Sequence, residues 1–532
     1  MKKLIIQSVL LSLIAISCLD TSKKELLQSQ MPSEIDEESL YRPNYHFTPK
    51  VGWMNDPNGM FYYNGYYHLF FQHYPDGNKW GPMHWGHAIT TDLVHWKEMP
   101  IALYPDEKGY IFSGSTVIDF ENKSGLGKDG QTPIVAFFTY HNPKLEKTES
   151  TELQTQGMAY SVDEGITWTK FENNPVVNNP GIRDFRDPKV SWDEASDQFV
   201  MTLAAGQKIM FYGSKNLKEW SFLSDFGDGV GNHGGVWECP DLFPIKVEGT
   251  EDTKYVLLVS INPGGPNGGS ATQYFIGDFV GGKFIIDAKL AGKLPSDHNY
   301  WVDFGKDNYA GVTWSNASLK DGAKLFIGWM SNWQYANEVP TQKWRSASTI
   351  PRELRLIDLG DDYRLTFQPT KNIKEFYAAK LKKEVLKVDE KAVKVFDSKN
   401  IPLTSTKLSF TLKEAKNSSF ITELRNEVGD TLKFGFDHLN QTFFIDRSLA
   451  GKTEFSNEFS SKKSIAPRIS NNEDLKVTAL LDKTSLELFY DDGTTVMTEI
   501  FFLNQPFSEL WMKSKKGQIN LNSIEVHELK IN

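Results

Sequence analysis

The chain has 532 residues, of which 39% are hydrophobic and 24% are charged, and its formal net charge at pH 7 is −10. This length allows two to four ordinary domains, or one large domain and a smaller one, and the composition is that of a soluble globular protein. No run of basic residues is long enough to form a nucleic-acid track, so nucleic acid is excluded as a partner.

The N-terminal segment, residues 1–18, has the features of a bacterial lipoprotein signal peptide. Lys2 and Lys3 precede an apolar run from Leu4 to Ile16, which is too short for a permanent membrane-spanning helix. Cys18 follows a small residue, as at a lipoprotein cleavage site, and we expect it to be lipidated. The alternative is simple cleavage and release of the chain.

Residues 19–40 are polar and acidic, and we expect them to form a flexible tether. Together these two segments predict an exported bacterial protein, a periplasmic or outer-membrane lipoprotein that is attached to the membrane only through its lipid. The only other cysteine is Cys239, so a chain lipidated at Cys18 has no intrachain disulfide.

The sequence between residues 45 and 350 is typical of many antiparallel strands. Short aromatic and β-branched runs alternate with Gly, Asn, Asp and Pro, and no long amphipathic helical pattern interrupts them. The clearest predicted strands cover residues 65–72, 134–140, 198–203, 255–261 and 325–330.

A weak repeat divides this region. A short polar turn with Asp or Asn precedes a tryptophan three times, at residues 91–96, 161–168 and 214–220. Intervals of roughly 50 residues suit four-stranded propeller blades, in which a tryptophan wedges between neighbouring blades. A chance similarity among Trp-rich strands is the alternative. At about 50 to 60 residues per blade, the region holds five or six blades.

The pattern changes at about residue 356. We expect residues 356–384 to form a linker, in which the charged stretch from Lys371 to Leu386 could be a helix. Alternating strands such as residues 408–412 follow, and Asp492-Gly493 predicts a hairpin turn. We therefore expect a second all-β domain, a β-sandwich, over residues 385–532.

Two aspartates that precede prolines are candidates for chemistry. In Asn55-Asp56-Pro57 the proline favours an extended backbone at Asp56, although these residues would also make a good Asx turn. In Arg186-Asp187-Pro188 the neighbouring cation would keep the carboxylate ionised. A surface ion pair explains the second motif equally well.

Glu238 is a third candidate, because it lies in the mainly apolar stretch Trp237–Phe243. Glutamate is seldom buried without cause. An apolar environment raises the pKa of a carboxyl group, as a general acid that works near neutral pH requires. A glutamate at the edge of a blade is the alternative explanation.

Two further motifs are weaker when taken alone. Phe112–Ser115 places small polar residues behind an aromatic residue and is better explained as a turn. Gly328–Tyr335, which includes Trp333, supplies the aromatic faces and amides of a sugar platform, but another Trp-rich strand would look the same. In a propeller, however, the innermost strand of each blade lines one central funnel. The spacing of these motifs can therefore bring one polar group per blade, or per two blades, into a single pocket. Such a pocket would contain two carboxylates with different surroundings, which glycoside hydrolysis needs.

Four of the motifs together resemble the signature motifs of glycoside hydrolase family 32, which contains invertases, inulinases and levanases. They are Trp53–Gly59, Phe112–Ser115, Arg186–Pro188 and Trp237–Pro240. Near the C-terminus, Ile445–Ser448 and Leu486–Gly493 are similar to motifs of the family's sandwich domain. The resemblance runs from about Tyr41 to the C-terminus. It implies an all-β fold in which a five-bladed β-propeller, the catalytic domain over residues 41–355, is followed by a C-terminal β-sandwich.

The resemblance also implies roles for individual residues. Asp56 corresponds to the nucleophile, Glu238 to the acid/base, and Asp187 to a transition-state stabiliser that binds fructose hydroxyls. The positions that match the family's −1 subsite, which binds the terminal fructosyl unit, are Asn55, Gln72, Trp80, Phe112, Ser113, Arg186 and Trp333. The family retains the anomeric configuration, which fits two closely spaced carboxyl groups and a covalent intermediate.

No cofactor is implied, and no metal is needed. His84 and His87 have a spacing that could suggest zinc, but no third ligand cluster accompanies them. The stretch from Ile327 to Thr341 looks like exo-acting bacterial levanases and inulinases, so we expect release of terminal β-fructofuranosyl units from levan or inulin, with sucrose also split. The alternatives are an endo-levanase, a fructosyltransferase and a non-catalytic fructan-binding surface lipoprotein. We expect a monomer.

Overall fold

The computed structural model describes residues 37–294, 299–317, 319, 321–398 and 403–531. The expected signal peptide with Cys18, and the expected tether up to residue 36, lie outside the described residues. The chain divides into two compact units, Met1–Tyr41 and Arg42–Asn532, and the short helix α2 (Glu37–Tyr41) belongs to the first. No helix within the described ranges combines the length and the apolar character needed to cross a membrane.

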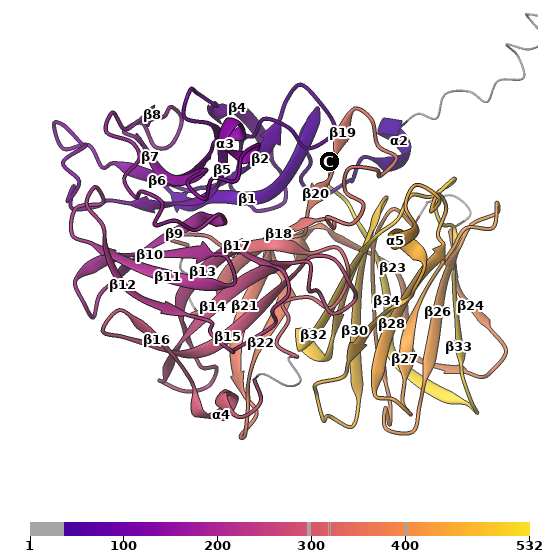
Figure 1. The fold of residues 1–532 in the computed structure, drawn as a ribbon. Helices are drawn as coiled ribbons and strands as arrows, with labels where there is room; N and C mark the ends of the chain where they lie inside the picture. Colours follow the sequence, from indigo (N-terminus) through magenta and orange to yellow (C-terminus); the bar gives the residue numbers. More distant parts are fainter. Residues whose placement is uncertain (1–36, 295–298, 318, 320, 399–402, 532) are drawn as a thin grey trace, which may run out of the picture. The chain divides into compact units, whose positions relative to one another are not determined.

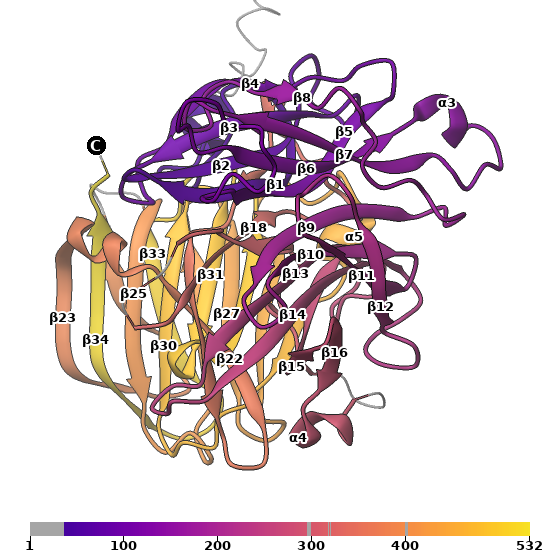
Figure 2. The same cartoon turned by 90° about the vertical axis from the view of Figure 1, so that its left-hand side faces the viewer.

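The second unit begins with five sheets, which we call blades I to V (Figures 1 and 2). Their strands follow one another along the chain, as expected for a propeller. Blade I contains β1 (Gly52–Tyr63), β2 (Tyr66–Tyr74), β3 (His84–Thr90), β4 (Lys97–Leu103) and β19 (Trp344–Arg345). Blade II contains β5 (Tyr110–Ile118), β6 (Ile134–His141), β7 (Gln154–Ser161) and β8 (Thr169–Lys170).

The remaining three blades have the same plan. Blade III contains β9 (Phe185–Asp193), β10 (Gln198–Ala205), β11 (Lys208–Ser214) and β12 (Ser221–Phe226). Blade IV contains β13 (Val236–Lys246), β14 (Thr253–Asn262), β15 (Ala271–Val280) and β16 (Lys283–Ile286). Blade V contains β17 (Tyr309–Thr313), β18 (Lys324–Met330), β20 (Ala347–Ser348), β21 (Arg352–Asp358) and β22 (Tyr363–Pro369).

The first strand of each blade lies at the centre of a closed ring. Strand β1 packs beside β5, β5 beside β9, β9 beside β13, β13 beside β17, and β17 beside β1. Four of the five clearest predicted strands lie within β6, β10, β14 and β18, and the fifth begins one residue before β2. The predicted five-bladed propeller is therefore confirmed, and its five innermost strands surround one axis.

The three predicted tryptophan turns occupy the same place in three blades. Each lies between the third and fourth strands, that is, between β3 and β4, β7 and β8, and β11 and β12. Trp168 packs edge-on against Phe70 of blade I, and Trp220 packs in the same way against Phe137 of blade II, both with ring centroids 5.5 Å apart. The repeat therefore marks blades, and each of these two tryptophans fills the seam with the preceding blade.

The C-terminal part consists of two six-stranded antiparallel sheets, which confirms the predicted sandwich (Figure 1). One sheet contains β23 (Tyr377–Val388), β34 (Ile519–Leu529), β25 (Ser405–Leu412), β30 (Leu475–Asp482), β31 (Ser485–Tyr490) and β32 (Thr495–Ile500). The other contains β24 (Val393–Asp397), β33 (Glu509–Ser514), β26 (Phe420–Arg425), β27 (Thr431–Asp437), β28 (Thr442–Leu449) and β29 (Ser464–Pro467).

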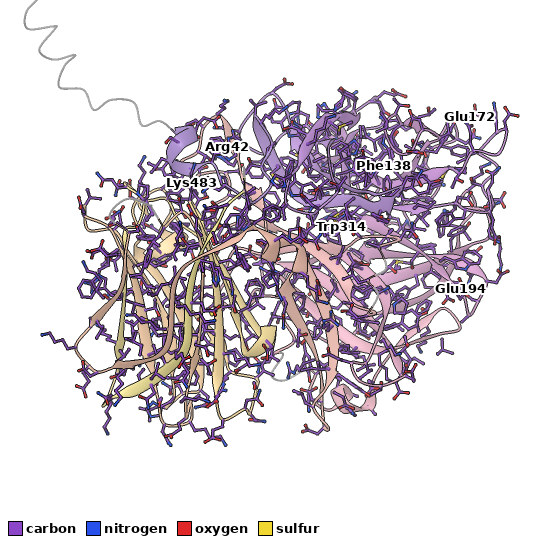
Figure 3. All side chains as sticks on the ribbon, turned by 180° about the vertical axis from the view of Figure 1, so that it is seen from behind. Arg42, Phe138, Glu172, Glu194, Trp314 and Lys483 are labelled. Atoms are coloured by element: carbon purple, nitrogen blue, oxygen red, sulfur yellow. The ribbon has the colours of Figure 1, made fainter. Side chains whose placement is uncertain are left out.

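The predicted strand at residues 408–412 lies within β25, along which burial alternates from residue to residue. The predicted hairpin at Asp492-Gly493 joins β31 to β32 through the short 3₁₀ helix η2 (Asp491–Gly493). The other short helices are α3 (Pro143–Glu146), α4 (Ala288–Ala291), α5 (Asn457–Ser460) and η1 (Lys371–Phe376). Figure 3 shows Phe138 and Trp314 in the interior of the propeller, whereas Glu172 and Glu194 project at its periphery.

The expected linker over residues 356–384 differs from the structure. Strands β21 and β22 belong to blade V, so the propeller extends to residue 369, and the sandwich begins with β23 at residue 377. The expected helix over residues 371–386 is wrong, because only η1 is helical and the rest is an edge strand. Charged side chains on the exposed face of β23 explain the difference, since edge strands carry charges that block pairing with other chains.

Buried ion pairs join the sandwich to the propeller. Arg352 of β21 contacts Asp303 (Nη1–Oδ2, 2.9 Å) and Glu487 of β31 (Nη2–Oε2, 2.5 Å). Arg447 of β28 pairs with Asp307 (Nη1–Oδ2, 2.6 Å) in the same manner. Because breaking one partner of a buried pair leaves a desolvated charge, these contacts fix the register of the two parts.

His46 extends this network and makes it sensitive to pH. Its Nδ1 lies 2.8 Å from Asp482 Oδ2, and its Nε2 lies 2.7 Å from Glu487 Oε1. Burial alone lowers the pKa of His46, but the hydrogen bonds and charges of the two carboxylates outweigh burial and raise the pKa from 6.5 to about 9. The charged imidazole therefore stabilises the fold fully below pH 6.5, and this stabilisation is lost as the pH rises through about 9.

We expect the His46→Gln variant to lose about 3 kcal/mol of unfolding free energy near pH 6, and much less near pH 10. Chemical denaturation of the wild type and the variant at both pH values measures this difference. The same destabilisation at both pH values would show that the charge of His46 does not contribute.

Candidate active site

Each of the five innermost strands contains a β-bulge. The pairing register shifts once in β5, β9, β13 and β17, and twice in β1. The residues displaced near the pocket are Asn55–Asp56, Phe112–Ser113, Asp187–Pro188, Cys239–Pro240 and Ala310–Gly311. A bulge bends its strand and changes the direction of a side chain, and bulges are common next to active sites. Blades I to IV thus break their regular pairing at a candidate residue or directly beside one.

Two of the bulges place a residue before proline in the left-handed region. Asp187 has a φ of 65°, and Cys239 has a φ of 45°. Residues before proline usually have an extended backbone, but at Asp187 the bulge overrides this local preference. As a result, the backbone N–H of Cys239 donates to Asp187 Oδ2 at 3.0 Å, which ties the bulge of blade IV to that of blade III.

Five of the bulged residues, Asn55, Asp56, Phe112, Ser113 and Asp187, line one cavity of about 460 Å³. All ten residues predicted for the site line it: Asn55, Asp56, Gln72, Trp80, Phe112, Ser113, Arg186, Asp187, Glu238 and Trp333. Sequence reasoning missed a second group of lining residues: His141, Glu146, Leu153, Gln154, Arg183, Asp184 and Asn337. Only Arg183 and Asp184 carried a signal, because they lie within four residues of the Arg-Asp-Pro motif. The others come from strand ends and loops without a motif.

Asp56 lies deep in this pocket. Its Oδ2 accepts a hydrogen bond from the Ser113 hydroxyl at 2.7 Å and lies 3.5 Å from the Cys239 sulfur. Its Oδ1 is buried and has no hydrogen-bond partner among the described residues. Burial raises the pKa of Asp56 and the charge of Glu238 adds to this, whereas hydrogen bonds from Asn55 and Ser113 oppose it. One oxygen is thus held and the other is left free.

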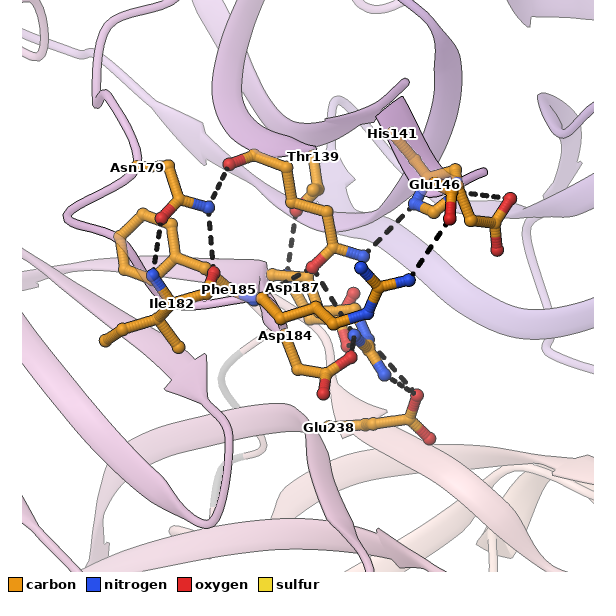
Figure 4. Close-up of polar contacts among 12 residues, drawn as sticks. Thr139, His141, Glu146, Asn179, Ile182, Asp184, Phe185, Asp187 and Glu238 are labelled. Carbon is orange, nitrogen blue, oxygen red and sulfur yellow. Dashed lines mark hydrogen bonds and ion pairs between the residues drawn. The ribbon is translucent and has the colours of Figure 1, made fainter. Parts of the chain in front are cut away.

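Glu238 lies half-buried and is held on both oxygens. Arg186 donates to Oε1 from Nη2 at 2.8 Å and from Nε at 3.2 Å, and the Tyr309 hydroxyl contacts Oε2. Figure 4 shows Glu238 and Asp184 around this guanidinium, which also donates to Asp184 at 2.6 Å. The expected apolar shell of Glu238 is therefore wrong, because an arginine and a tyrosine surround its carboxyl group.

Asp187 is the third carboxylate and is almost fully buried. The Arg186 guanidinium lies 4.0 Å from it and bonds to Glu238 and Asp184 instead, so the expected pairing within the Arg-Asp-Pro motif is only a weak contact. Burial raises the pKa of Asp187 to about 7, Arg186 opposes this shift, and the charges of Glu238 and Asp56 add to it. The charges of Glu238 and Asp56 therefore act on Asp187 across one small space.

Aromatic rings form the walls of the pocket. The ring of Trp333 stacks on Trp53 with centroids 5.8 Å apart. Phe112 lies parallel to His141 at 4.2 Å, and Trp80 packs edge-on against Phe112 at 6.0 Å. Such rings present an apolar face beside polar edges, which suits a ligand that has both C–H faces and hydroxyl groups.

The two histidines considered for zinc do not share a site. His84 packs against the ring of Tyr104, whereas His87 is buried and bonds to His68 at 3.0 Å. Residues three apart on a strand point to opposite faces, which explains the separation. Within the described part of the chain, no group of three or more His, Cys, Asp or Glu side chains could hold a metal ion. Cys239 is a free, buried thiol.

This fold and pocket define a glycoside hydrolase, and comparison with known proteins gives the family. The profile of the glycosyl hydrolases family 32 N-terminal domain matches residues 46–369, and the profile of the family's C-terminal domain matches residues 374–528. The chain belongs to glycoside hydrolase family 32.

Three similar proteins illustrate the relationship. The levanase of Bacillus subtilis (strain 168) is 43% identical over 499 residues, which cover 94% of this chain and 71% of the levanase. The extracellular exo-inulinase of Aspergillus niger is 38% identical over 92% of this chain and 94% of its own length. The β-fructofuranosidase of Schwanniomyces occidentalis, solved with fructosyl-erythritol, superposes with a TM-score of 0.80 at 34% identity, covering 94% of this chain and 100% of that one.

Proposed function

We propose that this protein is a retaining, exo-acting β-fructosidase that releases terminal fructosyl units from levan or inulin and also splits sucrose. The observation that carries the proposal is the convergence of Asp56 and Glu238, from blades I and IV, in one pocket with different surroundings. Glycoside hydrolysis needs two such carboxyl groups. The names of the similar levanase, exo-inulinase and β-fructofuranosidase support the fructosyl substrate.

In the proposed reaction Asp56 is the nucleophile. The Ser113 hydroxyl holds Oδ2, so Oδ1, which has no partner in the described chain, is available to attack the anomeric carbon C2 of the fructosyl unit. The bond from C2 to the leaving oxygen breaks as the ester bond to Asp56 forms. Asp187, buried on the same side of the pocket, would bind fructose hydroxyls and stabilise the transition state.

Glu238 is the proposed acid/base. Arg186 donates two hydrogen bonds to Oε1, which leaves Oε2, beside the Tyr309 hydroxyl, as the oxygen that carries the proton. That proton goes to the leaving oxygen in the first step. In the second step Glu238 removes a proton from water, which attacks C2 and releases fructose with its configuration retained. This chemistry requires no metal or cofactor.

Chromatography of the products from levan, inulin and sucrose over time tests this proposal. We expect free fructose from the first minutes onward, without intermediate oligosaccharides. If oligosaccharides appear before fructose, the protein is the endo-levanase considered above. Fructosyl transfer that dominates at high sucrose would identify a transferase, and binding of fructan without any product would identify a capture protein.

We also propose that the protein is exported and anchored as a lipoprotein through Cys18, in the periplasm or at the outer membrane of a bacterium. The N-terminal sequence supports this proposal, and one similar protein, the exo-inulinase of Aspergillus niger, is extracellular. Metabolic labelling with a clickable fatty acid tests it, with Cys18→Ala as the control. Label that persists in this variant would contradict the assignment.

A further inference from the structure

An exposed aromatic residue lies on blade I, at the end that carries the pocket. Gln72 of β2 pairs with Trp85 of β3, and Trp85 pairs with Leu103 of β4. Tyr104 follows Leu103 directly and is 55% exposed. Because neighbouring strands are about 4.8 Å apart, three steps place Tyr104 roughly 14 Å outward from the strand that carries Asp56. Tyr104 is therefore too far away to contact a sugar unit bound at Asp56.

Tyr110 lies beside the pocket and is joined to Tyr104 by the short turn between β4 and β5. It begins β5, and its half-buried ring lies 6.5 Å from Trp80 and 6.2 Å from His141, two residues that line the pocket. The hydroxyl groups of Tyr104 and Tyr110 have no hydrogen-bond partner in the part of the chain that the structure describes. The ring of Tyr110 thus extends the aromatic wall beyond the residues that line the pocket.

Two loops flank this edge, and each is fixed by side chains. On one side, the loop around α3 is held by Arg183, which donates to the carbonyl oxygens of Glu146 and Ser150 at 3.3 and 3.2 Å. On the other side, the loop between β2 and β3 is held by a hydrogen bond from the Trp80 backbone N–H to Asn337 Oδ1 at 2.9 Å. The first loop belongs to blade II and the second to blade I, the two blades that carry Tyr110 and Tyr104.

The turn that joins the two tyrosines is also fixed. Lys170 Nζ donates to the carbonyl oxygen of Tyr104 and to Asp106 Oδ2, both at 2.5 Å. The Tyr140 hydroxyl donates to Asp106 at 2.9 Å, and Asp106 exchanges backbone hydrogen bonds with Gly109. A rigid surface loses less conformational entropy on binding, so this turn is preorganised for a ligand.

From this arrangement we infer that Tyr110 and Tyr104 form an outer binding surface for the fructan chain behind the unit that is cleaved. The inference rests on the proposed function, because it takes the pocket as the site of the terminal fructosyl unit. A chain leaving the pocket passes between the two fixed loops, lays sugar C–H faces on the two rings, and hydrogen-bonds to the phenol hydroxyls. Sucrose is a disaccharide and is too short to reach Tyr104 from the pocket, so this surface favours polymers over sucrose.

The test compares kcat/KM for long-chain inulin and levan with kcat/KM for sucrose. In Tyr104→Ala we expect the ratio of polymer to sucrose to fall about five-fold for at least one of the two polymers, and the double variant with Tyr110→Ala should lower it further. Tyr104→Phe keeps the ring and should keep most of the ratio. Tyr66→Ala is the matched control, because Tyr66 is 45% exposed on the same blade but at the opposite end of β2, and it should leave the ratio unchanged.

The outcomes separate this inference from the proposed function. If wild-type protein releases fructose but Tyr104→Ala has the wild-type ratio for both polymers, the outer surface is wrong and the proposed function stands. If wild-type protein releases no fructose from any of the three substrates, the proposed function itself fails. A fall of the same size in Tyr66→Ala would also overturn the inference, because the effect would then not depend on the pocket end of the blade.

Discussion

Replacing Asp56 with asparagine should lower kcat by about 10⁵-fold, because an amide cannot replace the carboxylate that attacks C2 in the proposed reaction. The same change should raise the melting temperature by a few degrees. Burial and the charge of Glu238 raise the pKa of Asp56, so the folded state disfavours its ionised form at neutral pH, and an amide of the same shape removes that cost. Steady-state kinetics on sucrose and thermal unfolding measure the two effects.

Asp241→Asn is the matched control for this prediction. Asp241 is fully buried on β13, only three residues beyond Glu238, but its Oδ2 accepts hydrogen bonds from the Thr313 N–H at 2.6 Å and the Thr313 hydroxyl at 2.7 Å. This variant should be less stable and yet keep most of its kcat, the reverse of Asp56→Asn. Loss of activity in both variants with similar losses of stability would mean that Asp56 has a structural role.

Replacing Glu238 with glutamine should lower kcat for sucrose by about 10³-fold, because the leaving oxygen then departs without a proton. β-Fructosyl fluoride needs no such proton, so the first step should stay close to the wild-type rate with this substrate. Stopped-flow measurement of fluoride release separates the first step from the second. Azide, a nucleophile that needs no general base, should restore turnover of the fluoride.

Asp184→Asn provides the comparison for Glu238. Asp184 shares the Arg186 guanidinium with Glu238 but is not placed to protonate the leaving group. Its loss should affect sucrose and β-fructosyl fluoride to the same extent. Equal losses for both substrates in Glu238→Gln as well would contradict the assignment of Glu238 as the acid.

The sequence predicts the blades well because blade packing depends on local patterns. The turns before Trp168 and Trp220 precede the fourth strands of blades II and III, and each ring fills the seam with the preceding blade. The failed prediction concerns residues 371–386. The charges there favour a linking helix, but strand β23 pairs with β34, a partner more than a hundred residues away in sequence. Only the strand pairing in the structure shows that β23 is the edge strand of its sheet.

The sequence predicts which residues line the site, but not which hydrogen bonds and ion pairs they form. The family resemblance points to all ten residues, and seven of them lie on the innermost strands β1, β5, β9 and β13, which must line the axis. The partners of Arg186 could not be predicted, because a bulge at Asp187 turns that carboxylate away and leaves the guanidinium to Glu238 and Asp184. The outer rim, including Glu146, comes from loops whose positions depend on long-range bonds such as those of Arg183.

The most direct test of this account is to find the covalent bond itself. Glu238→Gln should react with β-fructosyl fluoride and then stall, because the base that activates water is missing. Digestion and tandem mass spectrometry of the stalled protein should locate one fructosyl group on the peptide that contains Asp56, attached to that residue. A fructosyl group on any other residue, or turnover of the fluoride to inverted fructose without an adduct, would contradict the assignment of Asp56 as nucleophile.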